Sequence, residues 1–170
     1  MQTSFRPATP ADLAFILENI KGLAAVEGRP DVVTVSTQRL GALLFGSTPV
    51  AQCSIVHAAG IGDVGHAWYY YFAPTFTGTL VLYLEDLYIR PEYRGLGIGR
   101  DCMAHLAALA KAAGAEGMAW SVVDGNDAAV SFYEQLGAHP KIGSTTYRLD
   151  GDEFERLSHA AAPPRIRPIG

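Results

Sequence analysis

The chain has 170 residues, of which 49% are hydrophobic and 18% are charged, which fits one globular domain with a real core and excludes a mostly disordered chain. The net charge is −4 and no dense run of lysine and arginine occurs, which argues against a dedicated nucleic-acid binder. No apolar stretch approaches about 18 residues, and no basic start followed by an apolar run opens the chain. We therefore expect no membrane span, no secretory signal and a cytoplasmic location.

The first half of the chain predicts two helices and four strands. Thr9-Pro10-Ala11-Asp12 combines an N-cap, a proline at the first helical position and an acid in the first turn, and leucines and isoleucines follow at helical spacing. Ser36 opens the second helix and Gly46 closes it. In chain order we expect a strand at 3–7, helices at 9–26 and 36–45, and strands at 50–57, 63–72 and 79–89.

The second half continues the alternation of helices and strands. We expect a helix at 98–113, a strand at 117–123, a helix at 126–136, strands at 139–142 and 145–149, and a short acidic helix at 152–157. Together these elements predict an α/β (α+β) fold, with helices on both faces of a mixed sheet. Residues 1–158 are expected to form a single domain and residues 159–170 an extended or mobile tail.

The most informative segment is a strand that runs into a glycine-rich loop and then directly into a helix. Pro91 stops strand pairing because it has no N–H to donate. The first amides of a helix lack internal acceptors and face the positive end of the helix dipole, so such a junction binds anions. The dinucleotide motif fails because Arg100 stands where its third glycine is needed, and no Gly-Lys-Ser/Thr of a Walker loop is present.

The motif present is Arg94-x-x-Gly97-x-Gly99. It resembles the Arg/Gln-x-x-Gly-x-Gly/Ala signature of the GCN5-related N-acetyltransferases (GNAT superfamily), whose loop amides hold the pyrophosphate of coenzyme A. Asn126 followed by Phe132-Tyr133-Glu134-Gln135-Leu136-Gly137-Ala138 is similar to the second landmark of that superfamily. The stretch from Tyr83 to Gly99, the aromatic run 68–72 and Trp120-Ser121-Val122 resemble its diamine (spermidine/spermine) N-acetyltransferase branch, and the likeness covers about residues 3–157.

The resemblance implies acetyl-CoA as the acyl donor and a GNAT-type, mostly antiparallel sheet with one splayed parallel strand pair. The acetyl thioester lies between those two strands in the family, which here would end near Ile89 and Val123. Arg94 would add positive charge for the cofactor, or would instead pair with Glu92, and Asn126 would contact the cofactor or cap its helix. The implied cofactor-binding residues are Leu87, Tyr88, Ile89, Arg94, Gly95, Leu96, Gly97, Ile98, Gly99, Arg100, Asn126 and Ala129.

The resemblance also implies two catalytic residues, Tyr133 and Glu85. Tyr133 matches the tyrosine that serves as general acid toward the coenzyme A sulfur, although proton transfer from a phenol to a thiolate is uphill by about 2 kcal/mol in water. Glu85 matches a carboxylate linked to deprotonating the amine, since only about one alkylamine molecule in a thousand is neutral near pH 7. The implied substrate-binding residues are Glu27, Asp86 and Trp120. Because Glu85 and Asp86 are adjacent, a regular strand would turn them to opposite faces.

The substrate inferred from these residues is the primary amine of a small molecule, either diamine-like or amino-acid-like. The loop Ala73-Pro74-Thr75-Phe76-Thr77 lacks the acid that polyamine enzymes carry there, which weakens the case for spermidine. Acetylation of a protein lysine or N-terminus, and a non-catalytic acyl-CoA-binding module, stay open as alternatives. The family also implies a homodimer, with the aromatic strand as its local support.

Two further kinds of chemistry are not expected. The five histidines are scattered without metal-ligand spacing, so no metal site is predicted. Cys53 and Cys102 fall in a predicted strand and a predicted helix, where buried packing is favoured over an acyl-cysteine intermediate.

Overall fold

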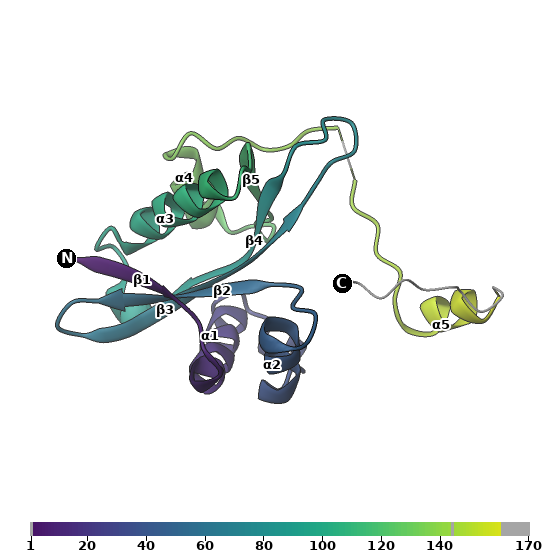
Figure 1. Ribbon diagram of the computed structural model, residues 1–170, viewed down its shortest axis with the longest axis horizontal. Coiled ribbons are helices and arrows are strands. Elements are labelled where there is room, and N and C mark those ends of the chain that lie inside the picture. Colours follow the sequence, from purple (N-terminus) through teal and green to yellow (C-terminus); the bar gives the residue numbers. More distant parts are fainter. Residues whose placement is uncertain (1, 144, 161–170) are drawn as a thin grey trace. The chain divides into compact units, whose positions relative to one another are not determined.

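The computed structural model describes residues 2–143 and 145–160, and its elements are labelled in Figure 1. Two compact units can be distinguished, residues 1–130 and residues 131–170, and each is described by itself. The first unit holds a five-stranded sheet whose strands follow the chain in the order β1-β2-β3-β4-β5. Neighbouring strands are antiparallel except for the parallel pair β4–β5. The strands are β1 (Thr3–Pro7), β2 (Gln52–Ala58), β3 (Gly62–Phe72), β4 (Val81–Ile89) and β5 (Gly117–Trp120).

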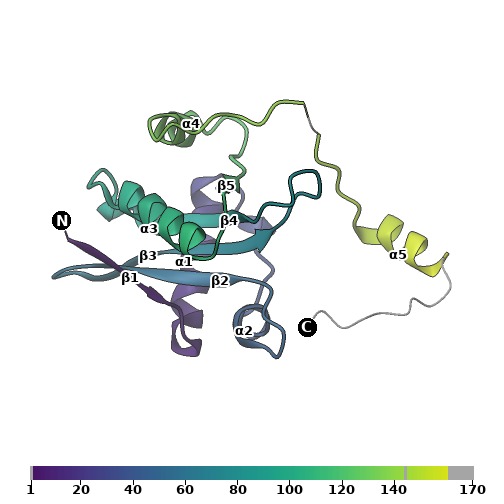
Figure 2. The ribbon, with the colours of Figure 1, turned by 45° about the horizontal axis from the view of Figure 1, so that its top comes forward.

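Helices cover both faces of this sheet, as Figure 2 shows. On one face, α1 (Leu13–Val26) and α2 (Thr37–Phe45) bury an apolar cluster that includes Ile16, Leu40 and Ile55. On the other face, α3 (Ile98–Ala112) packs against a second cluster that includes Val56 and Ile89. We call these the α1/α2 face and the α3 face. The predicted fold class, a mixed sheet with helices on both sides, is confirmed.

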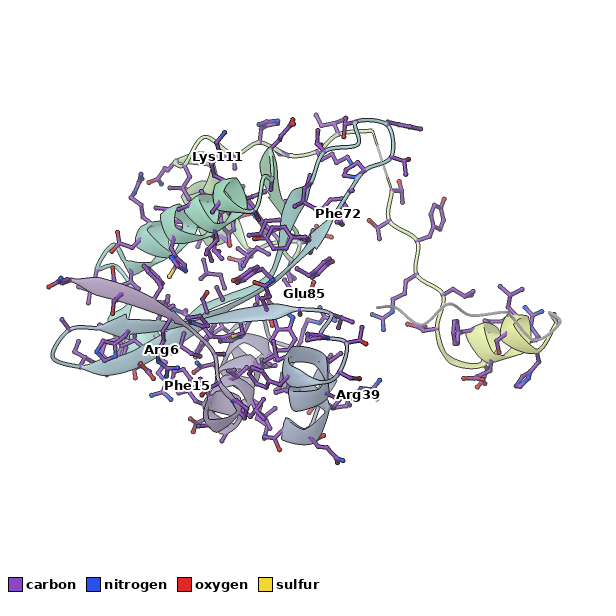
Figure 3. All side chains as sticks on the ribbon, in the orientation of Figure 1. Arg6, Phe15, Arg39, Phe72, Glu85 and Lys111 are labelled. Atoms are coloured by element: carbon purple, nitrogen blue, oxygen red, sulfur yellow. The ribbon has the colours of Figure 1, made fainter. Side chains whose placement is uncertain are left out.

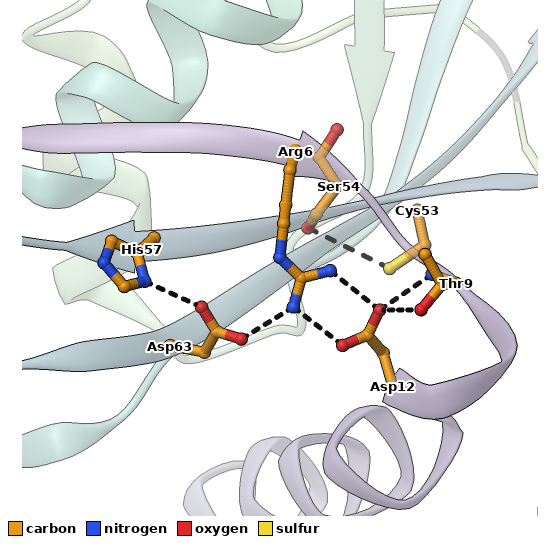
Figure 4. A network of polar contacts seen from close by, with 7 residues as sticks. All are labelled: Arg6, Thr9, Asp12, Cys53, Ser54, His57 and Asp63. Atoms are coloured by element: carbon orange, nitrogen blue, oxygen red, sulfur yellow. Dashed lines mark hydrogen bonds and ion pairs between the residues drawn. The ribbon is translucent and has the colours of Figure 1, made fainter.

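A network of charged side chains ties β1, the start of α1 and the β2–β3 hairpin together on the α1/α2 face (Figure 4). The guanidinium of Arg6 donates to Asp12 at 2.7 and 2.8 Å and to Asp63 at 2.7 Å. His57 Nδ1 lies 2.9 Å from the other oxygen of Asp63, and the backbone and hydroxyl of Thr9 donate to Asp12. We call Arg6, Asp12, Asp63 and His57 the Arg6 network. Its hydrogen bonds account for the short 3₁₀ turn Pro10–Asp12 that precedes α1.

The predicted N-cap of α2 is confirmed, because Ser36 Oγ accepts from Arg39 N at 3.2 Å. The predictions for the second half of the chain fare less well. The strand expected at 117–123 ends at Trp120, and no strand forms at 139–142 or in the described residues 145–149. A strand requires a hydrogen-bonded partner, and β-forming residues alone do not supply one.

The second unit contains the end of α4 (Asp127–Glu134), which begins in the first unit, and then α5 (Gly151–His159). The helix α5 is two residues longer than the predicted 152–157 at its C-terminal end and includes the first residue of the expected tail. Residues 161–170 of that tail lie outside the described residues. Arg156 pairs with Glu153 one turn earlier on α5, while Phe154 and Leu157 are exposed.

Candidate active site

The strand β4 contains one extra residue relative to β3. Trp68 pairs with Asp86 and the next residue, Tyr69, pairs with Leu84, so Glu85 has no partner in this register and forms a β-bulge. Bulges disturb the strict alternation of side chains and are common next to active sites. This bulge therefore sits at the pair of acids for which the sequence predicted catalysis and substrate binding.

The bulge reverses which positions of β4 face α3. Before the bulge, Leu82 and Leu84 are buried, and Leu84 lies on the α3 face opposite Tyr69 of β3. After the bulge, Leu87 and Ile89 pack in the apolar cluster beneath α3. The change from even to odd numbers leaves two residues between successive apolar positions, where a regular strand has one. This spacing, Leu84-x-x-Leu87, is a signal for the bulge that the sequence contains and that our prediction did not use.

The parallel pair β4–β5 separates at the same point. Its pairing runs from Val81↔Gly117 to Leu84↔Trp120, while β4 continues to Ile89. Strand β5 and its pairing end at Trp120, and the hydroxyls of the next residue, Ser121, and of Tyr83 lie 2.8 Å apart. The two strands thus diverge beside Glu85, as expected for a splayed pair.

Two acids act on Asp86 near the bulge: Glu85 beside it and Glu27 at the C-cap of α1. Burial raises the pKa of Asp86 to about 6, and the negative charges of Glu85 and Glu27 contribute to that rise. We call these three residues the acidic cluster. Among residues 2–143 and 145–160, none of the three carboxylates forms an ion pair, unlike Asp12, which pairs with Arg6, and Glu18, which pairs with Arg90. Within the described chain, the cluster is therefore a negative site without a protein cation.

The bulge interrupts the regular alternation from which Glu85 and Asp86 were expected to turn to opposite faces. Asp86 pairs with Trp68, which packs on the α1/α2 face. Burial and the charge of Glu85 both raise the pKa of Tyr70, another residue of that face, so Glu85 acts on both neighbours. Glu85 is exposed and Asp86 is partly buried.

The glycine loop and the start of α3 form the second part of the candidate site. Gly95 and Gly97 have φ angles of +74° and +84°, a conformation that favours glycine, and a Cβ added at either position would meet no atom within 4 Å. The first helical hydrogen bond runs from Asp101 N to Gly97 O at 3.1 Å. The amides of the first turn thus precede the internal ladder, and the open glycine backbone leaves room for an anion. These residues fit the diphosphate of coenzyme A.

Among the described residues, Arg94 does not form the ion pair with Glu92 that the sequence offered as one of its two roles. Its Nε donates to the carbonyl oxygen of Ile89 at 2.9 Å, and its guanidinium lies 5.5 Å from the centre of the Tyr88 ring. These contacts fasten the glycine loop to the end of β4, and no ion pair with Glu92 is formed in the described structure. Any contribution of Arg94 to cofactor binding stays a prediction.

The remaining cofactor candidates are placed as follows. Ile98 is buried against the core beneath the loop, Leu96 is about half exposed, and Gly99 and Arg100 lie in the first turn of α3. Asn126 caps α4, because its Oδ1 accepts from the backbone N–H of Ala129 at 3.1 Å. This confirms the helix cap that the sequence offered as one role of Asn126, and the amide of Ala129 is therefore already bonded within the protein.

The structure places the two remaining predicted site residues on separate elements, Trp120 on β5 and Tyr133 on α4. Trp120 pairs with Leu84, whose side chain faces α3, so the register places it on the opposite face from Asp86. Tyr133 lies on α4 in the second unit, its ring centre 5.0 Å from that of Phe132, and burial raises the pKa of its phenol. Their roles toward substrate and thiolate stay predictions.

The cysteines offer no nucleophile near neutral pH. Cys53 and Cys102 are buried, as predicted, and burial raises the pKa of each thiol to about 12. Among the described residues, no group of three or more His, Cys, Asp or Glu side chains is placed to hold a metal. No helix within the same residues is long and apolar enough to cross a membrane.

Comparison with known proteins identifies the lineage of this arrangement. Residues 46–138 match the model of the Acetyltransferase (GNAT) family. A thialysine N-epsilon-acetyltransferase of Sus scrofa is 34% identical over 163 residues, which cover 90% of this chain and 95% of the relative. Spermidine/spermine N(1)-acetyltransferase-like protein 1 of Homo sapiens is 35% identical over 139 residues, 78% of this chain and 20% of the larger human protein.

Among solved structures, an integron cassette protein from the mobile metagenome of V. cholerae has a TM-score of 0.74 at 22% identity, covering 93% of this chain and 98% of its own. This likeness shows a shared fold. The acidic bulge, the diverging parallel pair and the glycine loop at the start of α3 thus occur in a chain whose sequence matches one family over more than half its length. The chain belongs to the GNAT family of N-acetyltransferases, on its diamine acetyltransferase branch.

Proposed function

We propose that this N-acetyltransferase transfers an acetyl group from acetyl-CoA to the primary amine of a small molecule, by direct attack in a ternary complex. The observation that carries the proposal is the acidic cluster of Glu27, Glu85 and Asp86, which has no cationic partner among the described residues and lies where β4 and β5 diverge. An alkylammonium ion supplies the missing positive charge. The names of two relatives, a thialysine N-epsilon-acetyltransferase and a spermidine/spermine N(1)-acetyltransferase-like protein, support the same class of acceptor.

The acidic cluster performs two tasks in this mechanism. Glu27 and Asp86 attract the ammonium group, whose pKa near 10.4 keeps it charged at neutral pH. Glu85, the exposed member, accepts a proton from it through water and so produces the neutral, nucleophilic amine. An exposed carboxylate suits this task because it exchanges the proton with solvent.

The glycine loop and the end of β4 hold the cofactor. Amides from Gly95 to Arg100 bind the diphosphate at the start of α3, and backbone groups of Leu87, Tyr88 and Ile89 meet the pantetheine arm along the part of β4 that extends beyond β5. Acetyl-CoA, when bound, supplies the acetyl group and a thiolate leaving group. A backbone amide of β4 that is directed at the acetyl oxygen stabilises the charge that develops there.

Tyr133 is proposed to hydrogen-bond the departing sulfur. Burial raises the pKa of its phenol, so the side chain stays neutral and keeps the O–H that a donor needs. A higher phenol pKa also increases the cost of complete proton transfer, which favours a hydrogen bond over a full general-acid step. Asn126 contributes by capping the helix that carries this tyrosine.

We further propose that residues 1–158 work as one acetyltransferase domain and that the protein is a homodimer. The pig relative aligns with 90% of this chain, which covers both compact units. Light scattering of the purified protein measures the mass directly, and a monomer at micromolar concentration contradicts the dimer.

The test of function is amine-dependent release of free thiol from acetyl-CoA. The panel contains monoamines, diamines, lysine-like amino acids and lysine-containing peptides, with acetylated product identified by mass spectrometry. Turnover of small amines is expected. Turnover of peptides alone supports protein acetylation, and acetyl-CoA binding without any turnover supports a non-catalytic module, so either result overturns the proposal.

A further inference from the structure

A group of aromatic rings adjoins the acidic cluster on the α1/α2 face and has no role in the mechanism above. Tyr70 and Phe72 of β3 and Tyr83 of β4 form it. The rings of Tyr70 and Tyr83 are stacked with centres 5.1 Å apart, and the ring of Phe72 stands at 72° to Tyr83 with centres 6.1 Å apart. We call these three residues the aromatic ladder.

The ladder begins at the acids and leads toward the β3–β4 loop. The charge of Glu85 raises the pKa of Tyr70, after the larger effect of burial, so this carboxylate and this phenol interact. Phe72 lies farther toward the loop than Glu85, as Figure 3 shows, and is 39% exposed. A molecule whose amine reaches Glu85 can therefore lay its remainder along the rings.

A cavity of about 250 Å³ borders the ladder at Tyr70. The cavity is about half open to solvent, and its lining, which besides Tyr70 consists of Pro49, Val50, Ala51, Gln52 and Tyr71, presents both polar and apolar surface. An apolar cavity of about 150 Å³ is enough to hold a benzene ring. By volume, the space beside the ladder can thus take a group the size of one ring.

The arrangement of the rings favours an apolar group over a second ammonium. Cations bind to the negative faces of aromatic rings, whereas ring edges are positive. Here Tyr70 and Tyr83 turn one face each toward the other, and Phe72 contacts Tyr83 edge-on. The loop beyond, Ala73 to Gly78, contains no acid that would hold a remote cation.

The ring of Tyr83 is held in place before any ligand binds. Its hydroxyl lies 2.8 Å from that of Ser121, which follows β5, so the ring is fixed to both of the diverging strands. A fixed ring loses little side-chain freedom on binding and therefore contributes more to affinity.

We propose that the aromatic ladder and its adjoining cavity bind the non-reacting end of the acceptor, and that they select primary amines with an aryl or alkyl tail over amines with a second ammonium group. The inference rests on the proposed function, because Glu85 fixes the reacting end. It makes Tyr83 and Phe72 specificity-determining residues.

Three amines that share a four-carbon chain test this selectivity: butylamine, 1,4-diaminobutane and 4-phenylbutylamine. We expect kcat/KM for 4-phenylbutylamine to exceed that for butylamine by about tenfold, the effect of burying part of one ring, and 1,4-diaminobutane to show no gain over butylamine. A tenfold preference for the diamine, or no gain from the phenyl group, overturns the inference.

Matched variants assign the preference to the ladder. Tyr83→Ala should reduce the phenylbutylamine-to-butylamine ratio from about ten to about two, whereas Tyr83→Phe keeps the ring, loses the Ser121 contact and should retain most of the ratio. Phe76→Ala removes a fully exposed aromatic ring from the neighbouring loop and should leave the ratio unchanged. A ratio that is the same in Tyr83→Ala and the wild type contradicts the inference.

Failure of the proposed function gives a different result. If no amine is acetylated, binding of 4-phenylbutylamine and butylamine is measured directly by calorimetry on the wild type and Tyr83→Ala. Tighter binding of the phenyl compound that depends on the Tyr83 ring upholds the ladder as a binding surface without catalysis, and equal binding refutes it.

Discussion

Two groups of carboxylates lie on the α1/α2 face of the same sheet, and their surroundings differ in one respect. In the Arg6 network, Asp12 and Asp63 share one guanidinium. Hydrogen bonds from Arg6 lower the pKa of Asp12, and hydrogen bonds from His57 and Arg6 outweigh burial and lower the pKa of Asp63. In the acidic cluster no cation of the described chain is paired with the acids, and burial raises the pKa of Asp86 to about 6. The first group is neutralised by cations of the fold itself, whereas in our proposal the second is neutralised by the ammonium group of the acceptor.

The largest expected effect concerns activity at the acidic cluster. Glu85→Gln should lower kcat/KM for a small amine by about 100-fold or more, because the amine loses its proton acceptor, while the unfolding free energy stays the same or rises as like-charge repulsion is removed. Steady-state kinetics and urea denaturation measure the two quantities. Glu18→Gln, at an exposed acid paired with Arg90, is the control. Undiminished turnover in Glu85→Gln would remove this residue from the chemistry.

The opposite pattern is expected in the Arg6 network. Arg6→Met leaves two carboxylates without their partner and should lower the unfolding free energy by about 2–3 kcal/mol, less than for a fully buried pair because the Arg6 side chain is 41% exposed. Urea denaturation measures the loss. Turnover per folded molecule should change little. An unchanged unfolding free energy in Arg6→Met would show that the Arg6 network does not contribute to stability.

The pH dependence of stability should have opposite signs in the two groups. Asp86, with its raised pKa, favours the folded state below about pH 4, and this contribution is lost as the pH rises through 6. The stability of Asp86→Asn relative to the wild type should therefore increase by about 2 kcal/mol between pH 4 and pH 7. Denaturation at several pH values measures it.

Asp63 supplies the matched comparison. Its pKa is lowered, so its contribution is present at neutral pH and is lost as the pH falls below the ordinary carboxyl range. Asp63→Asn should be less stable than the wild type at pH 7, and the difference should shrink toward pH 3. If the stability differences of Asp86→Asn and Asp63→Asn from the wild type changed with pH in the same direction, the contrast between the two groups would be refuted.

The smallest effect measures coupling inside the acidic cluster. Glu27→Gln should lower the pKa of Asp86 slightly, because the weaker of the two negative charges that raise it is gone. NMR titration of the Asp86 carboxyl carbon detects such a shift. An unchanged titration would mean that Glu27 does not belong to the cluster.

Much of the fold could be predicted from local pattern. The helix at 98–113 was marked by its apolar stripe and terminal glycine, and the glycine loop before it by the residues themselves. Pairing was harder. Residues 121–123 and 145–149 have strand-forming side chains, yet whether they join a sheet depends on a partner strand that no local pattern specifies.

The candidate site shows the same division. Glu27, Glu85 and Asp86 were predicted from resemblance, and the structure places all three within electrostatic reach. The structural anchoring of Arg94 was not predicted, because the carbonyl of Ile89 as its acceptor follows from how the loop folds back on β4. The aromatic ladder was missed as a unit, since the stacking of Tyr70 on Tyr83 depends on the register between β3 and β4.

The unpaired position of Glu85 has a consequence for how this lineage can change. Leu82 and Leu84 precede it at even positions and Leu87 and Ile89 follow at odd ones, yet all four need an apolar environment. Deletion of Glu85 would restore regular alternation along β4. Leu87 and Ile89 would then turn to the α1/α2 face, and Asp86 and Tyr88 would turn toward α3. A substitution at Glu85 can therefore change the chemistry of the site and keep the register of β4, whereas a deletion there would disrupt the packing on both faces of the sheet.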